Sequence, residues 1–208
     1  HRGEGGGEVK IGVLCEFSGV VRDAFIARGH DAVSCDLLPT EAPGPHIQGD
    51  CLAQDWSGFD LMICHPPCTY LTWAGAGSWN DPGRSEKREN ALRFFVALWN
   101  LPAPRLAIEN PRGYPDKAFR RHSQEVNPFN FGDPHRKRVC LWLRGLPPLM
   151  HTTKVHVYPD KTYLKSNGRK YNCYFHQGKN GHARSRFFPG IARAMAEQWT
   201  TPKEPPHA

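Results

Sequence analysis

The sequence predicts one α/β domain built on a mostly parallel β-sheet, and two observations support this fold class. Short apolar segments rich in β-branched residues alternate with segments whose apolar residues recur at helical spacing. Several of the apolar segments are followed directly by an acidic residue or a cysteine. A chain of 208 residues is long enough for one such core and a small appendage.

Five apolar segments are expected to be strands, at residues 9–15, 32–36, 59–65, 105–109 and 139–143. Three segments have helical spacing, at residues 21–25, 91–98 and 191–195. A strand, a helix and a second strand in this order form a right-handed crossover between parallel strands. The sheet is therefore expected to be mostly parallel.

Polar side chains fall at the ends of four predicted strands or directly beyond them: Glu16, Asp36, Cys68 and Glu109. Open α/β sheets bind ligands outside the carboxyl ends of their strands. We therefore expect these four residues to converge on one rim of the sheet and to mark its functional site.

The charge is unevenly distributed along the chain. Residues 1–110 contain 9 basic and 14 acidic residues, whereas residues 111–188 contain 16 and 4. Ordinary scatter of surface charge is one interpretation, but an excess of this size favours a polyanion such as nucleic acid as the binding partner.

The chain has seven cysteines, an odd number, and most of them lie in apolar segments. This pattern favours free thiols over a disulfide framework.

His65-Pro66-Pro67-Cys68 is the sharpest local signal. Two prolines after a buried strand form a rigid turn that presents the Cys68 thiol at the sheet rim. A thiolate in that place can add to C6 of a cytosine ring while an acid protonates or hydrogen-bonds N3. Glu109 offers that acid if burial raises its pKa, and Asn110 could fix the cysteine loop. A plain turn is the alternative for Glu109 and Asn110.

Three further positions suit a nucleotide-like cofactor. Gly19 opens the first predicted helix, where backbone N–H groups can face a ligand. Asp36 occupies the usual place of an acid that binds ribose hydroxyls, and Asp50 the place of one that meets an adenine amino group. Each has a structural alternative as a turn or helix-cap residue.

Six motifs follow one another along the chain: Phe17-Ser18-Gly19, Asp36, Gly49-Asp50, Pro67-Cys68, Glu109-Asn110 and Arg136-Lys137-Arg138. Their order resembles that of the DNA cytosine-C5 methyltransferase family, in its compact phage and prophage form. The resemblance covers about residues 9–199. It implies a Rossmann-like methyltransferase sheet with helices on both faces and a small irregular insert, S-adenosylmethionine as cofactor, and methyl transfer to C5 of cytosine in DNA.

The resemblance also implies roles for individual residues. Cys68 is the covalent nucleophile, Glu109 the partner of N3 and Asn110 its support, while Arg136 and Arg138 contact the flipped cytosine and its phosphate. The cofactor is expected to contact Phe17, Ser18, Gly19, Asp36, Leu37, Asp50, Cys51 and Pro66. Three alternatives stay open: RNA as substrate, a carboxylated donor held by Arg184 and Arg186, or an inactive DNA-binding relative.

DNA contacts are expected from two segments. The loop at residues 69–90 offers Trp73, Trp79 and Arg84, for stacking and for phosphates, although both tryptophans could instead pack on the core. The insert offers Lys161, Lys165 and Lys170. No metal is expected, because Cys173, His176 and His182 lack a fourth ligand at standard spacing.

The predicted organisation has five parts. Residues 1–8 are a cloning remnant or disordered tail, 9–144 the catalytic and cofactor domain, 145–187 the DNA-recognition insert, 188–200 a returning helix, and 201–208 a tail. We expect a cytoplasmic protein of a bacterium or phage-infected host, with DNA as partner and no membrane or obligate protein partner.

Overall fold

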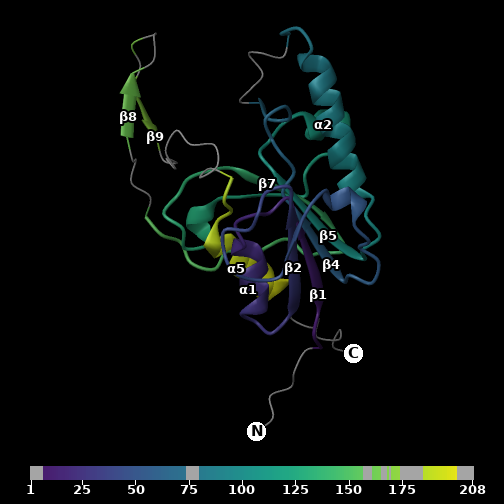
Figure 1. Ribbon diagram of the computed structural model, residues 1–208. Coiled ribbons are helices and arrows are strands. Elements are labelled where there is room, and N and C mark those ends of the chain that lie inside the picture. Colours follow the sequence, from purple (N-terminus) through teal and green to yellow (C-terminus); the bar gives the residue numbers. More distant parts are fainter. Residues whose placement is uncertain are drawn as a thin grey trace, which may run out of the picture.

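The computed structural model describes residues 7–73, 80–156, 161–164, 168, 170–173 and 185–200. A seven-stranded sheet in the order β3-β2-β1-β4-β5-β7-β6 forms its centre (Figure 1). The strands are β1 Lys10–Leu14, β2 Asp31–Asp36, β3 His46–Gln48, β4 Leu61–Cys64, β5 Arg105–Asn110, β6 Gln124–Val126 and β7 Val139–Arg144.

The first five strands of this sheet are parallel, and β7 is antiparallel to both of its neighbours, β5 and β6. The carboxyl ends of β1, β2, β4 and β5 therefore lie along one edge. The strand order reverses between β1 and β4, because the chain first winds outward to β3 and then returns to β4. Such a switch point is where open α/β sheets form their ligand crevice.

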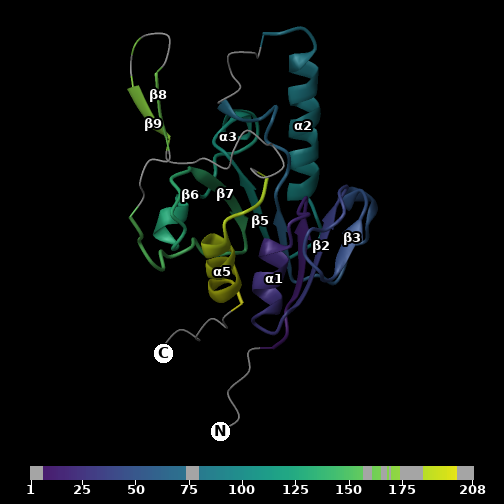
Figure 2. The ribbon, with the colours of Figure 1, turned by 60° about the vertical axis from the view of Figure 1, so that its left-hand side comes forward.

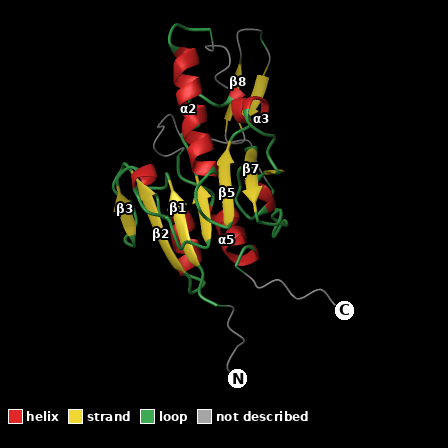
Figure 3. Ribbon diagram, turned by 90° about the vertical axis from the view of Figure 1, so that its right-hand side faces the viewer, coloured by secondary structure: helices red, strands yellow, loops and turns green. Residues whose placement is uncertain are grey.

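Helices cover both faces of the sheet. Helices α1 (Val20–Ile26) and α5 (Pro189–Gln198) lie side by side on one face, and α2 (Arg84–Trp99) lies on the other (Figures 2 and 3). Each face has its own apolar cluster, one built with Phe25 and Ile191, the other with Phe95 and Leu98. Because helices cover both faces of the sheet, a central strand such as β4 is buried at every position, and its sequence is a continuous apolar run. The predicted Rossmann-like α/β fold class is confirmed.

The remaining described elements are short. They are α3 Tyr114–Ala118, the 3₁₀ turns η1 Cys51–Ala53 and η3 Pro128–Asn130, and an antiparallel hairpin of β8 Lys161–Leu164 and β9 Lys170–Cys173. The hairpin falls within the insert expected at residues 145–187. Among the described residues, no helix has both the length and the apolar character needed to cross a membrane.

The five predicted strands correspond to β1, β2, β4, β5 and β7, and all three predicted helices are present. Three details differ. Strands β3 and β6 have three residues each, too few for a visible period. Strand β7 runs against the rest of the sheet. Helix α2 begins at Arg84, so the last seven residues of the predicted loop 69–90 are helical.

Candidate active site

A pocket of about 300 Å³ lies at the carboxyl edge of the sheet, beyond the ends of β1, β4 and β5. The loop after β4 and the segment before α5 complete its walls. The predicted site residues that line it are Phe17, Asp36, Pro66, Cys68, Glu109 and Asn110. Three of the four residues expected at the rim thus meet in one pocket, and Glu16 lies buried instead.

The turn that carries Cys68 is held at its start by two hydrogen bonds. The backbone N–H of His65 donates to the Leu14 carbonyl at 2.9 Å, which ties the turn to β1. The Asn110 side chain is buried, and its Nδ2 donates to the Pro66 carbonyl at 2.8 Å. Asn110 Oδ1 is buried with no hydrogen-bond partner among the described residues. Asn110 therefore anchors the turn from the neighbouring strand.

Backbone hydrogen bonds join the segment after Cys68 to the segment after β5. The Tyr114 N–H donates to the Leu71 carbonyl at 2.7 Å, and the Trp73 N–H donates to the Arg112 carbonyl at 3.2 Å. The two segments touch so closely that a Cβ on Gly113 would lie 2.0 Å from the Leu71 oxygen. Only glycine permits this approach.

Glu109 is largely buried, with Oε2 3.3 Å from Nδ1 of His65. Burial acts to raise the pKa of this carboxyl, but the His65 hydrogen bond and the positive charge of Lys137 outweigh it. The pKa of Glu109 therefore lies below its ordinary value. The expectation that burial would raise this pKa is wrong, because it left out both basic neighbours.

Of the predicted motif Arg136-Lys137-Arg138, the residue that lines the pocket is Lys137, between the two arginines. The Arg136 guanidinium lies 5.5 Å from the Phe129 ring centre, and Arg138, mostly exposed, pairs with Glu125 at 3.4 Å. Neither arginine lines the pocket with Cys68. Along an extended segment alternate side chains point to opposite sides, so Lys137 faces opposite to its neighbours.

A second pocket of about 300 Å³ adjoins the first and shares Cys15, Asp36 and Pro67 with it. Its lining includes the predicted cofactor residues Leu37, Asp50 and Cys51, together with Phe94 from α2. Leu37 is 72% exposed although it is a large apolar residue, and it stands at the rim. The two pockets together form an elongated crevice along β1, β2 and β4.

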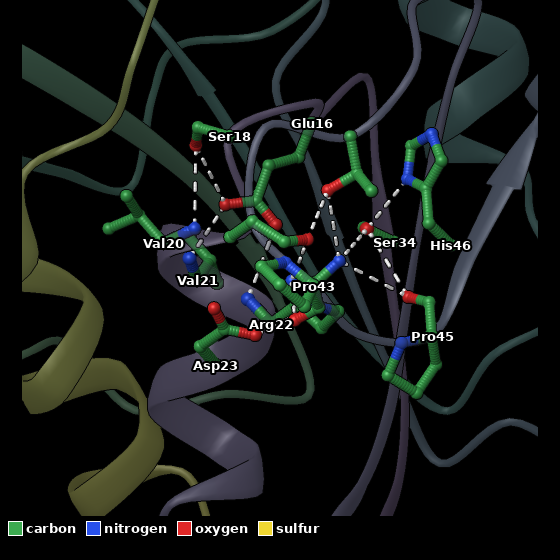
Figure 4. Close-up of polar contacts among 12 residues, drawn as sticks. Glu16, Ser18, Val20, Val21, Arg22, Asp23, Ser34, Pro43, Pro45 and His46 are labelled. Atoms are coloured by element: carbon green, nitrogen blue, oxygen red, sulfur yellow. Dashed lines mark hydrogen bonds and ion pairs between the residues drawn. The ribbon is translucent and has the colours of Figure 1, made fainter.

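The N-terminus of α1, which begins after Gly19, was expected to face a ligand, but the carboxylate of Glu16 lies there instead. This carboxylate accepts hydrogen bonds from the N–H groups of Val21, at 2.6 Å, and Arg22, at 3.2 Å (Figure 4). Gly19 caps α1 in a left-handed conformation, with φ 77°. Burial raises the pKa of Glu16, and these hydrogen bonds act in the opposite direction. Those two donors of α1 therefore serve a side chain rather than a ligand; Ser18 also donates to Glu16, at 3.4 Å.

Arg22 is fully buried and holds the loop between β2 and β3 (Figure 4). Its guanidinium donates to hydroxyls and carbonyls of β2 and that loop: Ser34, Thr40, Ala42, Pro43 and Pro45, at 3.1 to 3.4 Å. The loop begins with Leu37 and Leu38, which line the crevice. His46 supports the same loop, because its Nε2 donates to the Leu38 carbonyl at 3.0 Å.

Cys15 was absent from the predicted site but belongs to both pockets. It adopts a positive φ of 57°, a strained conformation for a residue with a side chain. Its Sγ lies 4.0 Å from Sγ of Cys51. The hydrogen bond with Cys51, followed by burial, raises the pKa of the Cys15 thiol well above its ordinary value. A signal was available, since Cys15 ends the first apolar segment.

The residues expected to contact DNA are only partly described. Trp73 is 39% exposed, and the Arg84 side chain donates to the Thr69 carbonyl at 3.1 Å and lies over the Tyr70 ring. Lys161 and Lys170 lie in β8 and β9. Trp79 and Lys165 lie outside the described residues, as do His176 and His182.

No protein-family model matches the sequence, and no curated protein matches it either. Among solved structures, the chain is similar to the methyltransferase EhMeth of Entamoeba histolytica, at 16% identity and a TM-score of 0.44. The match covers 77% of this chain and 61% of EhMeth, less than two thirds of that protein. The chain is also similar to the glycopeptide N-methyltransferase MtfA complexed with S-adenosylmethionine, at 14% identity and a TM-score of 0.30, over 74% of this chain and 70% of MtfA.

Proposed function

We propose that this protein transfers a methyl group from S-adenosylmethionine to C5 of cytosine in DNA, with Cys68 as the nucleophile. The observation that carries the proposal is the shared pocket of Cys68 and Glu109 at the sheet's switch point. The turn after β4 provides the thiol, and the end of the adjacent strand β5 provides the carboxyl group and the supporting amide, Asn110, which are the groups that this chemistry uses.

The crevice fits the proposed cofactor. Asp36 ends β2 at the place where an acid binds ribose hydroxyls, and one of its oxygens, Oδ1, accepts from the Leu38 N–H at 2.9 Å. Leu37 and Phe94 provide apolar surface for an adenine ring. The cofactor supplies a methyl group activated on a sulfonium.

In the reaction, the Cys68 thiol loses its proton to solvent and its sulfur bonds to C6 of the cytosine ring, which makes C5 nucleophilic. C5 then takes the methyl group, and S-adenosylhomocysteine is the leaving group. Loss of the C5 proton to solvent finally breaks the bond between the Cys68 sulfur and C6 and restores the thiolate. Glu109 is placed to face N3 as a carboxylate, because His65 Nδ1 and Lys137 lower its pKa, and it accepts a hydrogen bond from the proton that N3 takes up. Asn110 positions the Pro66-Pro67 turn, and Lys137 adds positive charge beside the carboxylate. A base inside a duplex must first be flipped out, at a cost of roughly a few kcal/mol.

DNA is proposed as the substrate because the basic residues concentrate in 111–188. Arg186, which also lines the pocket, forms a bidentate ion pair with Glu41, at 2.7 and 2.8 Å. That pairing engages one of the two guanidinium groups expected to hold a carboxylated donor, and so it favours an ordinary methyl group; the other, Arg184, lies outside the described residues.

The direct test is mass spectrometry of nucleosides after the protein is incubated with DNA and S-adenosylmethionine. We expect 5-methylcytosine with the intact chain and none with Cys68→Ala. Cys64→Ala is the matched control, because Cys64 is fully buried in β4 and does not line the pocket of Cys68. Normal methylation by C68A would contradict the proposal.

Two further reactions separate the alternatives. RNA replaces DNA in one, and a fluorinated cytosine, which traps the covalent adduct, is used in the other. Product on RNA alone would replace DNA as the substrate. Lack of both product and adduct would leave a DNA-binding relative without catalysis.

A further inference from the structure

A second group of reactive side chains lies between the segment after α3 and strands β6 and β7, and none of its members lines the pocket of Cys68. His122 follows α3, Glu125 lies on β6 and Cys140 on β7, and their candidate ligand atoms all lie within 4.8 Å of one another. Glu125 and Cys140 are directly paired in the antiparallel ladder. Directly paired residues project from the same face of a sheet, which accounts for the convergence.

The His122 ring is held by a carboxylate. Asp116 of α3 accepts from the His122 backbone N–H at 2.9 Å, and the same oxygen, Oδ1, lies 2.7 Å from Nδ1 of the ring. Nδ1 is thereby engaged, and Nε2 is the nitrogen available to a ligand. A carboxylate behind a histidine is the arrangement that orients metal-binding imidazoles. Asp116 Oδ2 is buried without a hydrogen-bond partner among the described residues.

The charges around the group favour a cation. The Cys140 side chain is fully buried, and the carboxylates of Asp116, Glu125 and Glu109 act on it electrostatically, as does the Arg112 guanidinium with the opposite sign. Arg138 pairs with Glu125 at 3.4 Å, but the Arg138 side chain is mostly exposed to solvent, which weakens this ion pair. A buried sulfur surrounded by carboxylates is therefore short of positive charge.

We infer that His122, Glu125 and Cys140 bind a zinc ion, with Asp116 orienting the histidine. One nitrogen, one oxygen and one sulfur ligand form a donor set that suits zinc. Zinc bonds of about 2.0–2.3 Å bring tetrahedral ligands to roughly 3.5 Å from one another, so side chains within 4.8 Å need only a small contraction. On binding, the Cys140 thiol loses its proton to solvent.

The ion would connect three elements of the fold, and a water molecule from solvent would take its fourth position. Cys140 pairs with Asn110 in the register of β7 and β5, so a metal at Cys140 joins α3, β6 and β7 beside the strand that carries Glu109 and Asn110. The inference does not depend on methyl transfer. No step of that reaction uses the ion.

The test measures zinc in the purified full chain by mass spectrometry, and its affinity by competition with a chromophoric chelator. We expect one zinc per chain. Cys140→Ser and His122→Ala should each weaken binding at least tenfold, and Asp116→Asn should weaken it by about 10–100-fold. Cys35→Ser is the matched control, because Cys35 is equally buried and its pKa is raised to about 11.

Two measurements keep the test decisive if a buried variant fails to fold. Glu125→Gln changes a partly exposed side chain and should weaken binding while the circular dichroism spectrum stays the same. Cobalt in the intact chain should show a thiolate-to-metal absorption band. A chain that takes up no metal, zinc retained by folded C140S, or zinc lost from Cys173→Ser and kept in C140S would each overturn the inference.

Discussion

Replacing Arg22 with methionine tests whether the buried guanidinium holds the β2–β3 loop. Methionine keeps much of the side chain's volume but donates no hydrogen bond. The carbonyls of Ala42, Pro43 and Pro45 then lose a donor, as do two hydroxyls. A buried acceptor left unpaired costs about 1–3 kcal/mol, and some of these groups regain water once the loop moves.

We expect R22M to lower the free energy of unfolding by about 3–5 kcal/mol, because several buried acceptors lose their donor at about 1–3 kcal/mol each and only some of them regain water. For a domain of this size, about 2–4 °C per kcal/mol converts this to a fall in Tm of roughly 6–20 °C. Thermal and urea denaturation measure both quantities. Arg28→Met is the control, because Arg28 is exposed just beyond α1. If R22M unfolded at the same temperature as R28M, the loop would not depend on Arg22.

Three other substitutions have defined outcomes. Glu109→Gln should slow turnover by roughly 10²–10⁴. Because the pKa of Glu109 lies below its ordinary 4.5, the ionised carboxyl group adds to the free energy of unfolding above pH 4.5. This contribution is lost as the pH falls through the folded-state pKa, so urea titrations of E109Q should not show that loss of stability in acid. Asp36→Ala should weaken S-adenosylhomocysteine binding by roughly 1.5–3 kcal/mol in calorimetry, and unchanged affinity would remove Asp36 from the cofactor site. Gly113→Ala should reduce turnover more than cofactor affinity, because its Cβ displaces the loop of Cys68; equal losses of both would point to general unfolding.

Local sequence patterns were sufficient to predict the central strands and helices of the fold. Strands such as β4 and β5 are buried on both faces, so their apolar runs are visible without knowledge of the fold. Parallel strands then bring their carboxyl ends to one edge, which is why Asp36, Cys68 and Glu109 could be placed together before any coordinates were known. The direction of β7 could not be predicted, since a strand's own sequence does not fix its orientation.

The electrostatics of the site depended on contacts between distant residues. The pKa of Glu109 is governed by His65, 44 residues earlier, and by Lys137. The helix N-terminus expected to face a ligand is instead bonded to Glu16, because that side chain folds back onto α1. A buried arginine such as Arg22 looks like any surface arginine in a sequence. Such contacts become visible only in three dimensions.

Hydrogen bonds join the loop of Cys68 to the segment after β5, so we expect these two segments to move together. Leu71 and Trp73 are bonded to Tyr114 and Arg112, and Gly113 leaves no gap between them. A displacement of β5 therefore carries the thiol and the carboxyl group together and preserves their spacing. The amide hydrogens of Trp73 and Tyr114 should accordingly exchange with solvent at matching rates, as parts of one cooperative opening.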